Sequence, residues 1–205
     1  MAVNTQHAEI GAEFAEPPRD PLVLLRDWFA AATARGVREP GAIALTTVAA
    51  DGEPSSRMIQ LSRFTGAGLL FATHTGSRKG RDIDGTGRWS GVLYWRETNQ
   101  QVTFGGHARD AGEAVADELW AQRPTDANAM SAVTRQSEPL ADERALLASA
   151  RALADGGPVP RPRHWAVYEL VLTHAEFWQS SADRLYRRLR YDRTDTGWAA
   201  VRLQP

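Results

Sequence analysis

The chain has 205 residues, the length of one ordinary domain and too short for two. Its 24 basic and 25 acidic side chains leave a formal net charge of −1, so no overall field favours nucleic acid or an anionic membrane. The absence of cysteine excludes disulfides, thiolate metal sites and cysteine nucleophiles. No apolar run approaches the roughly 18 residues of a membrane-spanning helix, and the first ten residues lack a secretion signal, so we expect a cytoplasmic protein.

The N-terminal part predicts an arm followed by one amphipathic helix. Residues 1–19 are polar and broken by prolines, and we expect a flexible arm there, with one domain over 20–205. Asp20 followed by Pro21 is a typical helix start, because aspartate caps free amides and proline needs no acceptor at the first position. The apolar residues that follow share one face, and Gly36 can end the helix. They are Leu22, Leu25, Phe29 and Ala32.

From residue 41 onwards the hydrophobic period changes to two, which indicates β-strands separated by turns such as Asp51-Gly52 and Thr98-Asn99. The predicted strands are 42–49, 54–63, 69–74, 88–97, 100–109, 164–178 and 196–203. Helical composition returns at 111–122 and 140–154, and the glycine- and proline-rich stretch 156–162 predicts a linker. We therefore expect a mainly β fold with flanking helices (α+β), built on an antiparallel sheet that curls into a barrel.

The clearest candidate binding motif is THTGSRKG at 73–80, directly after a predicted strand. Glycine permits a tight turn, Ser77 can cap a helix, and Arg78 and Lys79 lie where exposed amides already favour an anion. The loop lacks the first glycine and the last hydroxyl residue of a P-loop. A phosphate group fits this loop, and an ordinary capped turn with two solvated cations is the alternative.

Arg57 is a second candidate anion ligand. In a strand it shares one face with Ile59, while Met58 and Gln60 lie on the other. Burying an arginine on the apolar side of a strand is costly unless an anion pairs with it. The alternatives are an exposed strand end or a carboxylate partner such as Asp51.

Amide and indole side chains near predicted strand ends suit a heterocyclic ligand, because an amide offers a donor beside an acceptor and an indole offers a flat face. They are Gln100, Gln101, Gln136, Trp178 and Gln179, and each is also compatible with ordinary surface or core. The arginine-rich segment 184–193 suits a nucleic acid, but the near-neutral chain favours a few contacts with a small anion. The five histidines show no spacing typical of metal ligands, so we expect no metal site.

Five motifs in chain order resemble the pyridoxamine 5′-phosphate oxidase family. They are RMIQLS at 57–62, TGSRKG at 75–80, QQV at 100–102, RQS at 135–137, and EFWQ with RLYRRLRY between 176 and 191. The resemblance implies an FMN-binding split barrel that works as a homodimer, with the flavin between the subunits and neither nucleic acid nor membrane as a partner.

The resemblance also implies which residues hold the flavin. Arg57, Arg78 and Lys79 would bind the FMN phosphate. The other contacts, some from the partner chain, would come from Met58, Ile59, Gln60, Ala72, Thr73, Gln101, Gln136, Ser137, Trp178 and Arg188.

The substrate end of the site departs from the vitamer oxidases of this family. Their phosphate-binding lysine is Ser62 here, their tyrosine and serine correspond to Leu119 and Ala127, and only Arg123 of the group remains. The missing hydrogen bonds are each worth roughly 0.5–3 kcal/mol, so pyridoxine phosphate should bind poorly. Where those enzymes have Arg-Leu-His, this chain has Arg184-Leu185-Tyr186.

The chain is similar within this family to the flavin oxidases of phenazine biosynthesis. The shared segments are REP at 38–40, LYWRET at 93–98, NAMS at 128–131 and SSADRLYRR at 180–188. This implies an oxidase that takes hexahydrophenazine-1,6-dicarboxylate, or a decarboxylated relative, and passes electrons to dioxygen. Arg123 and Arg184 would each pair with a carboxylate, and Tyr186, Leu119 and Ala127 would widen and dry the pocket.

No side chain is expected to act as a catalytic acid or base, because the aromatic product already favours the reaction. Two other functions remain compatible with the sequence. One is a pyridoxine or pyridoxamine 5′-phosphate oxidase, and the other is a split-barrel protein that binds flavin or deazaflavin without catalysis.

Overall fold

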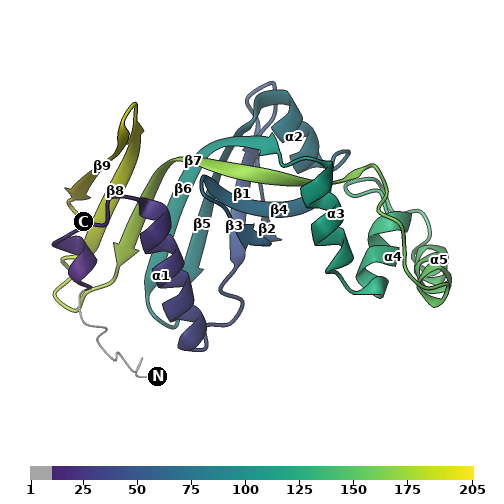
Figure 1. Ribbon diagram of the computed structural model, residues 1–205, viewed down its shortest axis with the longest axis horizontal. Helices are drawn as coiled ribbons and strands as arrows, with labels where there is room; N and C mark the ends of the chain where they lie inside the picture. Colours follow the sequence, from purple (N-terminus) through teal and green to yellow (C-terminus); the bar gives the residue numbers. More distant parts are fainter. Residues whose placement is uncertain (1–10) are drawn as a thin grey trace.

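A long antiparallel sheet runs through the molecule, with α1 lying across one part of it and α3, α4 and α5 grouped at one end (Figure 1). The computed structural model describes residues 11–205. The strands are β1 (Ala42–Val48), β2 (Pro54–Gln60), β3 (Arg63–Phe64), β4 (Gly68–His74), β5 (Arg88–Trp95), β6 (Gln100–Asp110), β7 (Trp165–Gln179), β8 (Arg187–Thr194) and β9 (Gly197–Leu203). The helices are η1 (Ala12–Phe14), α1 (Pro21–Ala34), α2 (Arg78–Thr86), α3 (Glu113–Ala121), α4 (Thr125–Val133) and α5 (Glu143–Asp155). This confirms the predicted mainly β class.

Helix α1 begins and ends at the predicted signals. Asp20 Oδ1 accepts a hydrogen bond from the Leu22 amide at 2.9 Å. At the other end Gly36 has φ +73°, and its amide and that of Val37 turn back to the carbonyls of Thr33 and Ala32. The predicted apolar face is confirmed, because the side chains of Leu22, Leu25 and Ala32 are buried against the sheet together with Trp28.

The segment before α1 is packed on the domain where the structure describes it. Residues 1–10, the first part of the expected arm, lie outside the described residues. Phe14 is buried with its ring centroid 6.1 Å from that of Trp28, and Glu13 accepts a hydrogen bond from the Trp28 indole at 2.6 Å. Tyr191 donates its hydroxyl to the carbonyl of Pro18 at 3.0 Å. Residues 11–19 therefore contribute to the core beside α1.

Strand β7 organises the sheet and explains where it splits. One edge of β7 pairs with β6, and the other edge pairs first with β4 and then with β8, giving the order β2-β1-β5-β6-β7-β4-β3 with β8 and β9 off this path. The register of β6 on β7 shifts between Gly105 and Gly106. A side chain at Gly106 would meet the carbonyl oxygen of Val171 at 2.1 Å, so the close approach requires glycine. On one side of this bulge β7 pairs with β4, and on the other side it pairs with β8.

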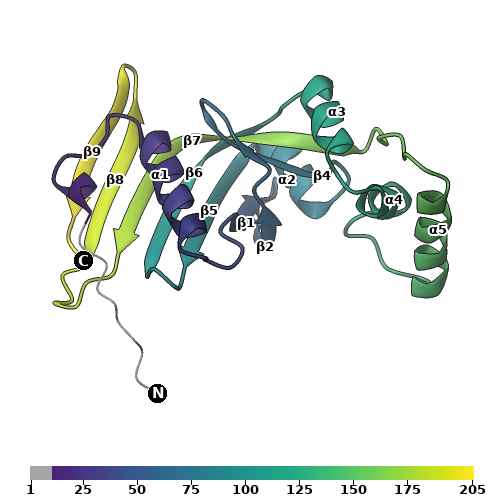
Figure 2. The same ribbon diagram turned by 60° about the horizontal axis from the view of Figure 1, so that its bottom comes forward.

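The helices at the far end form a small lobe on β4 and the start of β7 (Figure 2). A second core cluster joins Leu119 and Trp120 of α3 and Ala129 of α4 to Trp165 and Val167 of β7. Helix α4 is absent from the sequence-based prediction, because its face is made of small and polar residues with little helical periodicity. No helix in the described part of the chain is long and apolar enough to cross a membrane.

Candidate functional site

Three cations gather where β2 faces the start of α2. Ser77 caps α2 by accepting a hydrogen bond from the Gly80 amide at 3.2 Å, which confirms the predicted capped turn. The next two residues are Arg78 and Lys79, and the guanidinium of Arg57 comes from β2. Beyond the effect of burial, the charge of Arg57 is near enough to lower the pKa of Lys79, and the charge of Arg78 lowers the pKa of Arg57. A helix N-terminus with three cations is a favourable place for a phosphate.

Arg57 is held from beneath by hydroxyl groups and not by Asp51. Its Nη1 donates to Thr47 Oγ1 at 2.8 Å and to the Leu45 carbonyl at 3.4 Å, and its Nη2 donates to Ser55 Oγ. The carboxylate of Asp51 instead accepts from the backbone amide of Glu53 at 3.0 Å, within the turn. Among residues 11–205, neither Arg57 nor Lys79 forms a salt bridge. The structure thus excludes Asp51 as the carboxylate partner of Arg57.

The loop between α4 and α5 is tied to the same place. Gln136 Oε1 accepts from Thr73 Oγ1 at 3.0 Å and from Lys79 Nζ at 3.2 Å. Ser137 Oγ accepts from the backbone amide of Arg78 at 3.1 Å, and Ser137 has a positive φ of 73°. Residues from β4, α2 and this loop therefore meet at one point.

The electrostatics of the cluster favour an anionic ligand. Burial lowers the pKa of Lys79, and the charge of Arg57 lowers it further. Burial also lowers the pKa of Arg57, while the nearby carboxylate of Asp82 opposes that shift. Both shifts mean that the protonated forms are less well solvated than in water. A bound dianion would compensate for the lost solvation of both cations and stabilise their protonated forms.

A cavity of about 410 Å³ opens next to the cations. Its lining residues come from β2 and the short segment after it, from β4 and α2, and from the helical lobe, and all of them are among the predicted site residues. They are Met58, Ile59, Gln60, Ser62, Ala72, Thr73, Lys79, Arg123 and Gln136. The alternation predicted for β2 is also present, since Met58 is 62 % exposed whereas Arg57 is half-buried.

Arg123 is the second cation that lines this cavity, together with Lys79. Its guanidinium carbon lies 5.1 Å from the ring centroid of Trp165 and 5.4 Å from that of Trp120. Its Nη2 also donates to Ser131 Oγ at 3.0 Å and to the Ala127 carbonyl at 3.3 Å. Burial lowers the pKa of Arg123. Two indole faces and a hydroxyl hold the guanidinium in one position, beside the cavity where an acidic substrate can reach it.

Leu119 lies deeper than the resemblance implied. It is only 8 % exposed and belongs to the core under α3, and it does not line the 410 Å³ cavity. Ala127 is half-buried and meets Arg123 through its backbone carbonyl. Neither residue lines the cavity, and Ala127 contacts Arg123 through its backbone carbonyl.

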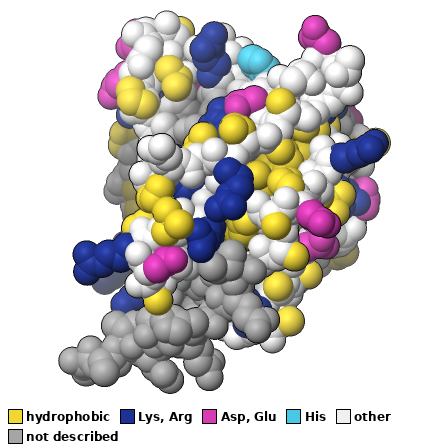
Figure 3. Space-filling model, turned by 90° about the vertical axis from the view of Figure 1, so that its left-hand side faces the viewer, with side chains coloured by type: hydrophobic (Ala, Val, Ile, Leu, Met, Phe, Trp, Pro, Cys, Tyr) yellow, Lys and Arg dark blue, Asp and Glu magenta, His cyan; other side chains and the backbone are white. Residues whose placement is uncertain are grey.

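The other predicted flavin contacts lie in a separate row across the sheet. Gln101 is opposite Trp178, and Trp178 is opposite Arg188, so the three side chains share one face. Tyr186 packs on Trp178 with ring centroids 5.2 Å apart, and Arg184 is exposed in the turn before it with φ +61°. Arg188 donates to Glu176 at 2.7 Å. This end of the molecule displays basic and apolar side chains next to one another (Figure 3).

The two groups of residues are far apart in one subunit. Ala72, which lines the cavity, is opposite Val167 of β7, whereas Gln101 is opposite Trp178 of the same strand. The eleven steps along β7 from Val167 to Trp178 span roughly 35 Å at about 3.3 Å per residue. The bulge at Gly105 and Gly106 lies between them. One chain therefore presents two halves of the predicted site at opposite ends of β7.

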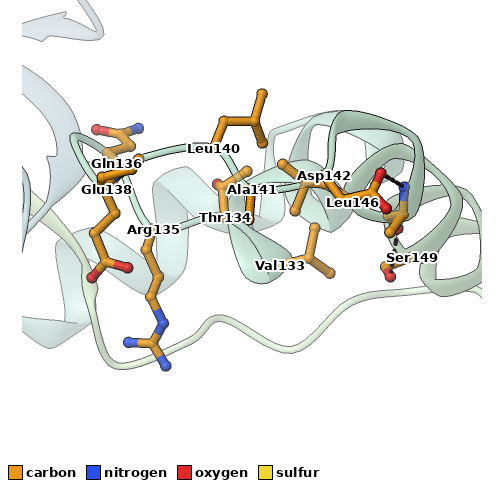
Figure 4. A pocket seen from close by; sticks show the side chains of 12 residues that line it. Val133, Thr134, Arg135, Gln136, Glu138, Leu140, Ala141, Asp142, Leu146 and Ser149 are labelled. Carbon is orange, nitrogen blue, oxygen red and sulfur yellow. Dashed lines mark hydrogen bonds between the residues drawn. The ribbon is translucent and has the colours of Figure 1, made fainter.

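A larger pocket of about 580 Å³ lies behind the Gln136 loop, between α4 and α5 (Figure 4). Its walls are mainly small and aliphatic, including Val133, Leu140 and Leu146. Arg135 and Glu138 belong to its lining as well, and Asp142 caps α5 by accepting from the Ala145 amide at 2.9 Å. This pocket lacks a cluster of cations, so the smaller cavity is the candidate site.

Two histidines meet beneath the same loop. The ring centroids of His74 and His164 are 4.6 Å apart, although the residues are distant in sequence. His74 is 2 % exposed. Its burial and, to a smaller extent, the charge of His164 lower its pKa to about 4, so the ring is neutral at neutral pH. No group of three or more metal-ligand side chains occurs within residues 11–205.

Sequence reasoning missed three residues that hold Arg57. Thr47 and Ser55 are opposite one another on β1 and β2, and both hydroxyls donate to Oδ2 of Asp82, at 2.6 and 3.2 Å. Ser55 could have been found, because it lies two residues before Arg57 on the same face of the strand. Thr47 and Asp82 carry no local signal, since their role depends on strand pairing and on how α2 packs.

Comparison with known proteins agrees with this geometry. Residues 29–165 match the model of the pyridoxamine 5′-phosphate oxidase family. Residues 165–205 match the pyridoxine 5′-phosphate oxidase C-terminal dimerisation region, which here contains Trp178, Tyr186 and Arg188.

Three similar proteins span nearly the whole chain. The dihydrophenazinedicarboxylate synthase of Pseudomonas chlororaphis is 46 % identical over 94 % of this chain and 87 % of its own. The pyridoxine/pyridoxamine 5′-phosphate oxidase of Rubrobacter xylanophilus is 37 % identical over 97 % of this chain and 92 % of its own. The crystal structure of PhzG from Burkholderia lata in complex with tetrahydrophenazine-1-carboxylic acid is 44 % identical, with a TM-score of 0.94 over 96 % of this chain and 98 % of that one. The implied split barrel is thereby confirmed, and the chain belongs to the pyridoxamine 5′-phosphate oxidase family.

Proposed function

We propose that this protein is an FMN-dependent oxidase of phenazine biosynthesis. Its substrate would be a partly reduced phenazine carboxylate, such as hexahydrophenazine-1,6-dicarboxylate, and dioxygen would accept the electrons. The observation that carries the proposal is the 410 Å³ cavity, which is lined by both Lys79 and the indole-held Arg123. The similarity to dihydrophenazinedicarboxylate synthase supports the choice of substrate class.

The residues present fit FMN. Lys79 and Arg57 are partly desolvated cations without a salt bridge in residues 11–205. Lys79 lies in the first turn of α2 and the charge of Arg57 on β2 is near it, so a phosphate would satisfy both. Arg78 adds a third charge, though it also contacts Glu53 at 3.2 Å. When bound, FMN would supply the redox chemistry by which the substrate loses two electrons and two protons and dioxygen is reduced to hydrogen peroxide.

We infer that each site is shared between two subunits. Lys79 and Gln136 of one protomer would meet the row formed by Gln101, Trp178 and Arg188 of its partner. The separation of these groups along β7 supports this arrangement, because one chain cannot bring both to a single ligand. The match of residues 165–205 to a dimerisation region supports it independently.

The substrate residues act by binding and orientation. Arg123 would pair with a substrate carboxylate, and the exposed Arg184 of the partner would pair with a second one. Trp178 and Tyr186 form an aromatic pair that suits a flat tricyclic ring. We assign no catalytic acid or base, because the residues lining the cavity include no carboxylate or histidine and aromatisation already favours the reaction.

Ser62 separates this function from a vitamer oxidase. It is exposed at the cavity and offers one neutral hydroxyl, where a substrate phosphate would need a cation. The 37 % identity to a pyridoxine/pyridoxamine 5′-phosphate oxidase keeps that activity as the second candidate.

Anaerobic reduction of the FMN-loaded protein tests the proposal. The flavin absorbance should bleach rapidly with a partly reduced phenazine dicarboxylate and slowly with pyridoxine 5′-phosphate, and it should return when air is admitted. Faster bleaching by pyridoxine 5′-phosphate would make the protein a vitamer oxidase. Failure of the protein to take up FMN would exclude both oxidase functions. The remaining alternative would be a split-barrel protein that binds a deazaflavin without catalysis.

A further inference from the structure

Asp82 is a buried carboxylate that does not line the 410 Å³ cavity. It lies on α2, three residues after Lys79, and is 6 % exposed. Its Oδ2 accepts two hydrogen bonds, from Thr47 Oγ1 at 2.6 Å and from Ser55 Oγ at 3.2 Å. A buried carboxylate close to a proposed phosphate site is unexpected, because like charges repel. The presence of this carboxylate beside the cations therefore needs a structural explanation.

The hydrogen-bond directions give that explanation. A hydroxyl group has one hydrogen to donate and lone pairs to accept with. Because Thr47 and Ser55 both donate to Asp82, their oxygens are left to accept, and both accept from Arg57. The carboxylate therefore fixes the direction of every bond in the chain from Asp82 through the hydroxyls to the guanidinium.

The same bonds decide which edge of Arg57 is available. Nη1 is used by Thr47 and by the Leu45 carbonyl, and one hydrogen of Nη2 is used by Ser55. Within residues 11–205, Nε has no hydrogen-bond acceptor. The edge formed by Nε and Nη2 is the one with which arginine binds a phosphate through two parallel bonds.

We propose that Asp82 is the positioning residue of the phosphate site: through Thr47 and Ser55 it holds Arg57 with its free edge toward the FMN phosphate. This inference rests on the proposed FMN site. Its own content is that a negative charge strengthens the binding of an anion, because ordering the guanidinium outweighs repulsion of the phosphate.

The sign of one substitution separates the two effects. If Asp82 acts only through its charge, Asp82→Asn removes a repulsion and FMN binds more tightly. If Asp82 positions Arg57, the asparagine can donate as well as accept, the hydroxyls lose their fixed direction, and FMN binds about 10-fold more weakly. Riboflavin, which lacks the phosphate, should bind both proteins equally.

Asp84→Asn is the matched control. Asp84 lies on the same helix and loses the same charge, but it is exposed and accepts from the Tyr168 hydroxyl at 2.9 Å. It should change FMN affinity by less than about two-fold. Ser55→Ala breaks the chain of bonds at another atom without changing the charge, and should weaken FMN binding by roughly 3- to 10-fold.

The measurement is a fluorescence titration of the flavin-free dimer of each variant with FMN and with riboflavin. Weaker FMN binding in Asp82→Asn and Ser55→Ala, with riboflavin unchanged, supports the proposal. Unchanged or tighter FMN binding in Asp82→Asn overturns it, as does an equal loss for both flavins, which would indicate a general structural role. If Asp82→Asn does not fold, Ser55→Ala decides alone. Equal affinity of the unsubstituted protein for the two flavins would refute the phosphate site itself.

Discussion

Lys79 Nζ lies 3.2 Å from the side-chain oxygen of Gln136, so the first turn of α2 is joined to the loop between α4 and α5. The same oxygen accepts from Thr73 at the end of β4. One atom, Gln136 Oε1, thus accepts hydrogen bonds from two other segments of the chain, the more distant of which lies 63 positions away. This contact places the proposed phosphate ligands and the helical lobe in a fixed relation.

Loss of both central cations should abolish flavin retention. We expect Arg57→Ala and Lys79→Ala each to weaken FMN binding about 10-fold or more, because each removes a charge-assisted bond, and the double variant to purify without flavin. The measurement is the ratio of bound FMN to protein after gel filtration. Arg151→Ala on the exposed face of α5 is the control and should keep its flavin. Full FMN content in the double variant would mean that the phosphate lies elsewhere.

The Gln136 amide should matter for the flavin and not for folding. Gln136→Ala removes the acceptor shared by Thr73 and Lys79, and we expect FMN affinity to fall roughly 3- to 10-fold with little change in thermal stability. Gln122→Ala, at the exposed residue that follows α3, is the matched control. Titration with FMN checks this, and equal affinity of the two variants would contradict the role of Gln136.

A single charge should shift the enzyme toward the vitamer substrate. Ser62 faces the cavity, so Ser62→Lys adds a cation for a substrate phosphate, and we expect the KM for pyridoxine 5′-phosphate to fall about 10-fold. Ser62→Met, which has similar length and no charge, should not show this gain. Steady-state assays under air provide the comparison. Equal KM values for the lysine and methionine variants would separate Ser62 from phosphate recognition.

The buried His74 should make folding sensitive to mild acid. Its pKa is lowered from 6.5 to about 4 in the folded protein, so the unfolded chain takes up a proton first as the pH falls. The free energy of unfolding should therefore decrease from pH 6.5 toward pH 4, by at most about 1.4 kcal/mol per pH unit from this group.

Urea unfolding over this range, compared between the unsubstituted protein, His74→Gln and His107→Gln, isolates the effect. His107 is exposed on β6, so its replacement should leave the pH slope unchanged. A slope in His74→Gln as steep as in the unsubstituted protein would show that acid sensitivity arises from other groups.

The sequence predicts features that depend on neighbouring residues. The signals at Asp20, Pro21 and Gly36 are local, so the bounds of α1 follow from them. The capped turn at Ser77 is predictable for the same reason. The resemblance to a family adds the residues of the cavity, which no spacing along the chain would have brought together.

Other features depend on how distant segments pair. Thr47 meets Ser55 only because β1 and β2 pair in that register, and Asp82 reaches both because α2 packs beneath them. The pairing of His74 with His164 likewise follows from the register of β4 on β7, in which His74 is opposite Trp165. Such contacts are set by tertiary structure, so a single sequence carries no signal for them.

The shared site is tested most directly with mixed dimers. Subunits with the double substitution Arg57→Ala and Lys79→Ala, and subunits with Arg188→Ala, carry different affinity tags and are produced together, and the dimer that holds one of each is purified. If Lys79 of one subunit and Arg188 of the other serve one flavin, this dimer has one intact site of two and should bind about half the FMN of the unsubstituted dimer, whereas each variant alone binds almost none. A mixed dimer that also lacks FMN would show that each site is built within one subunit.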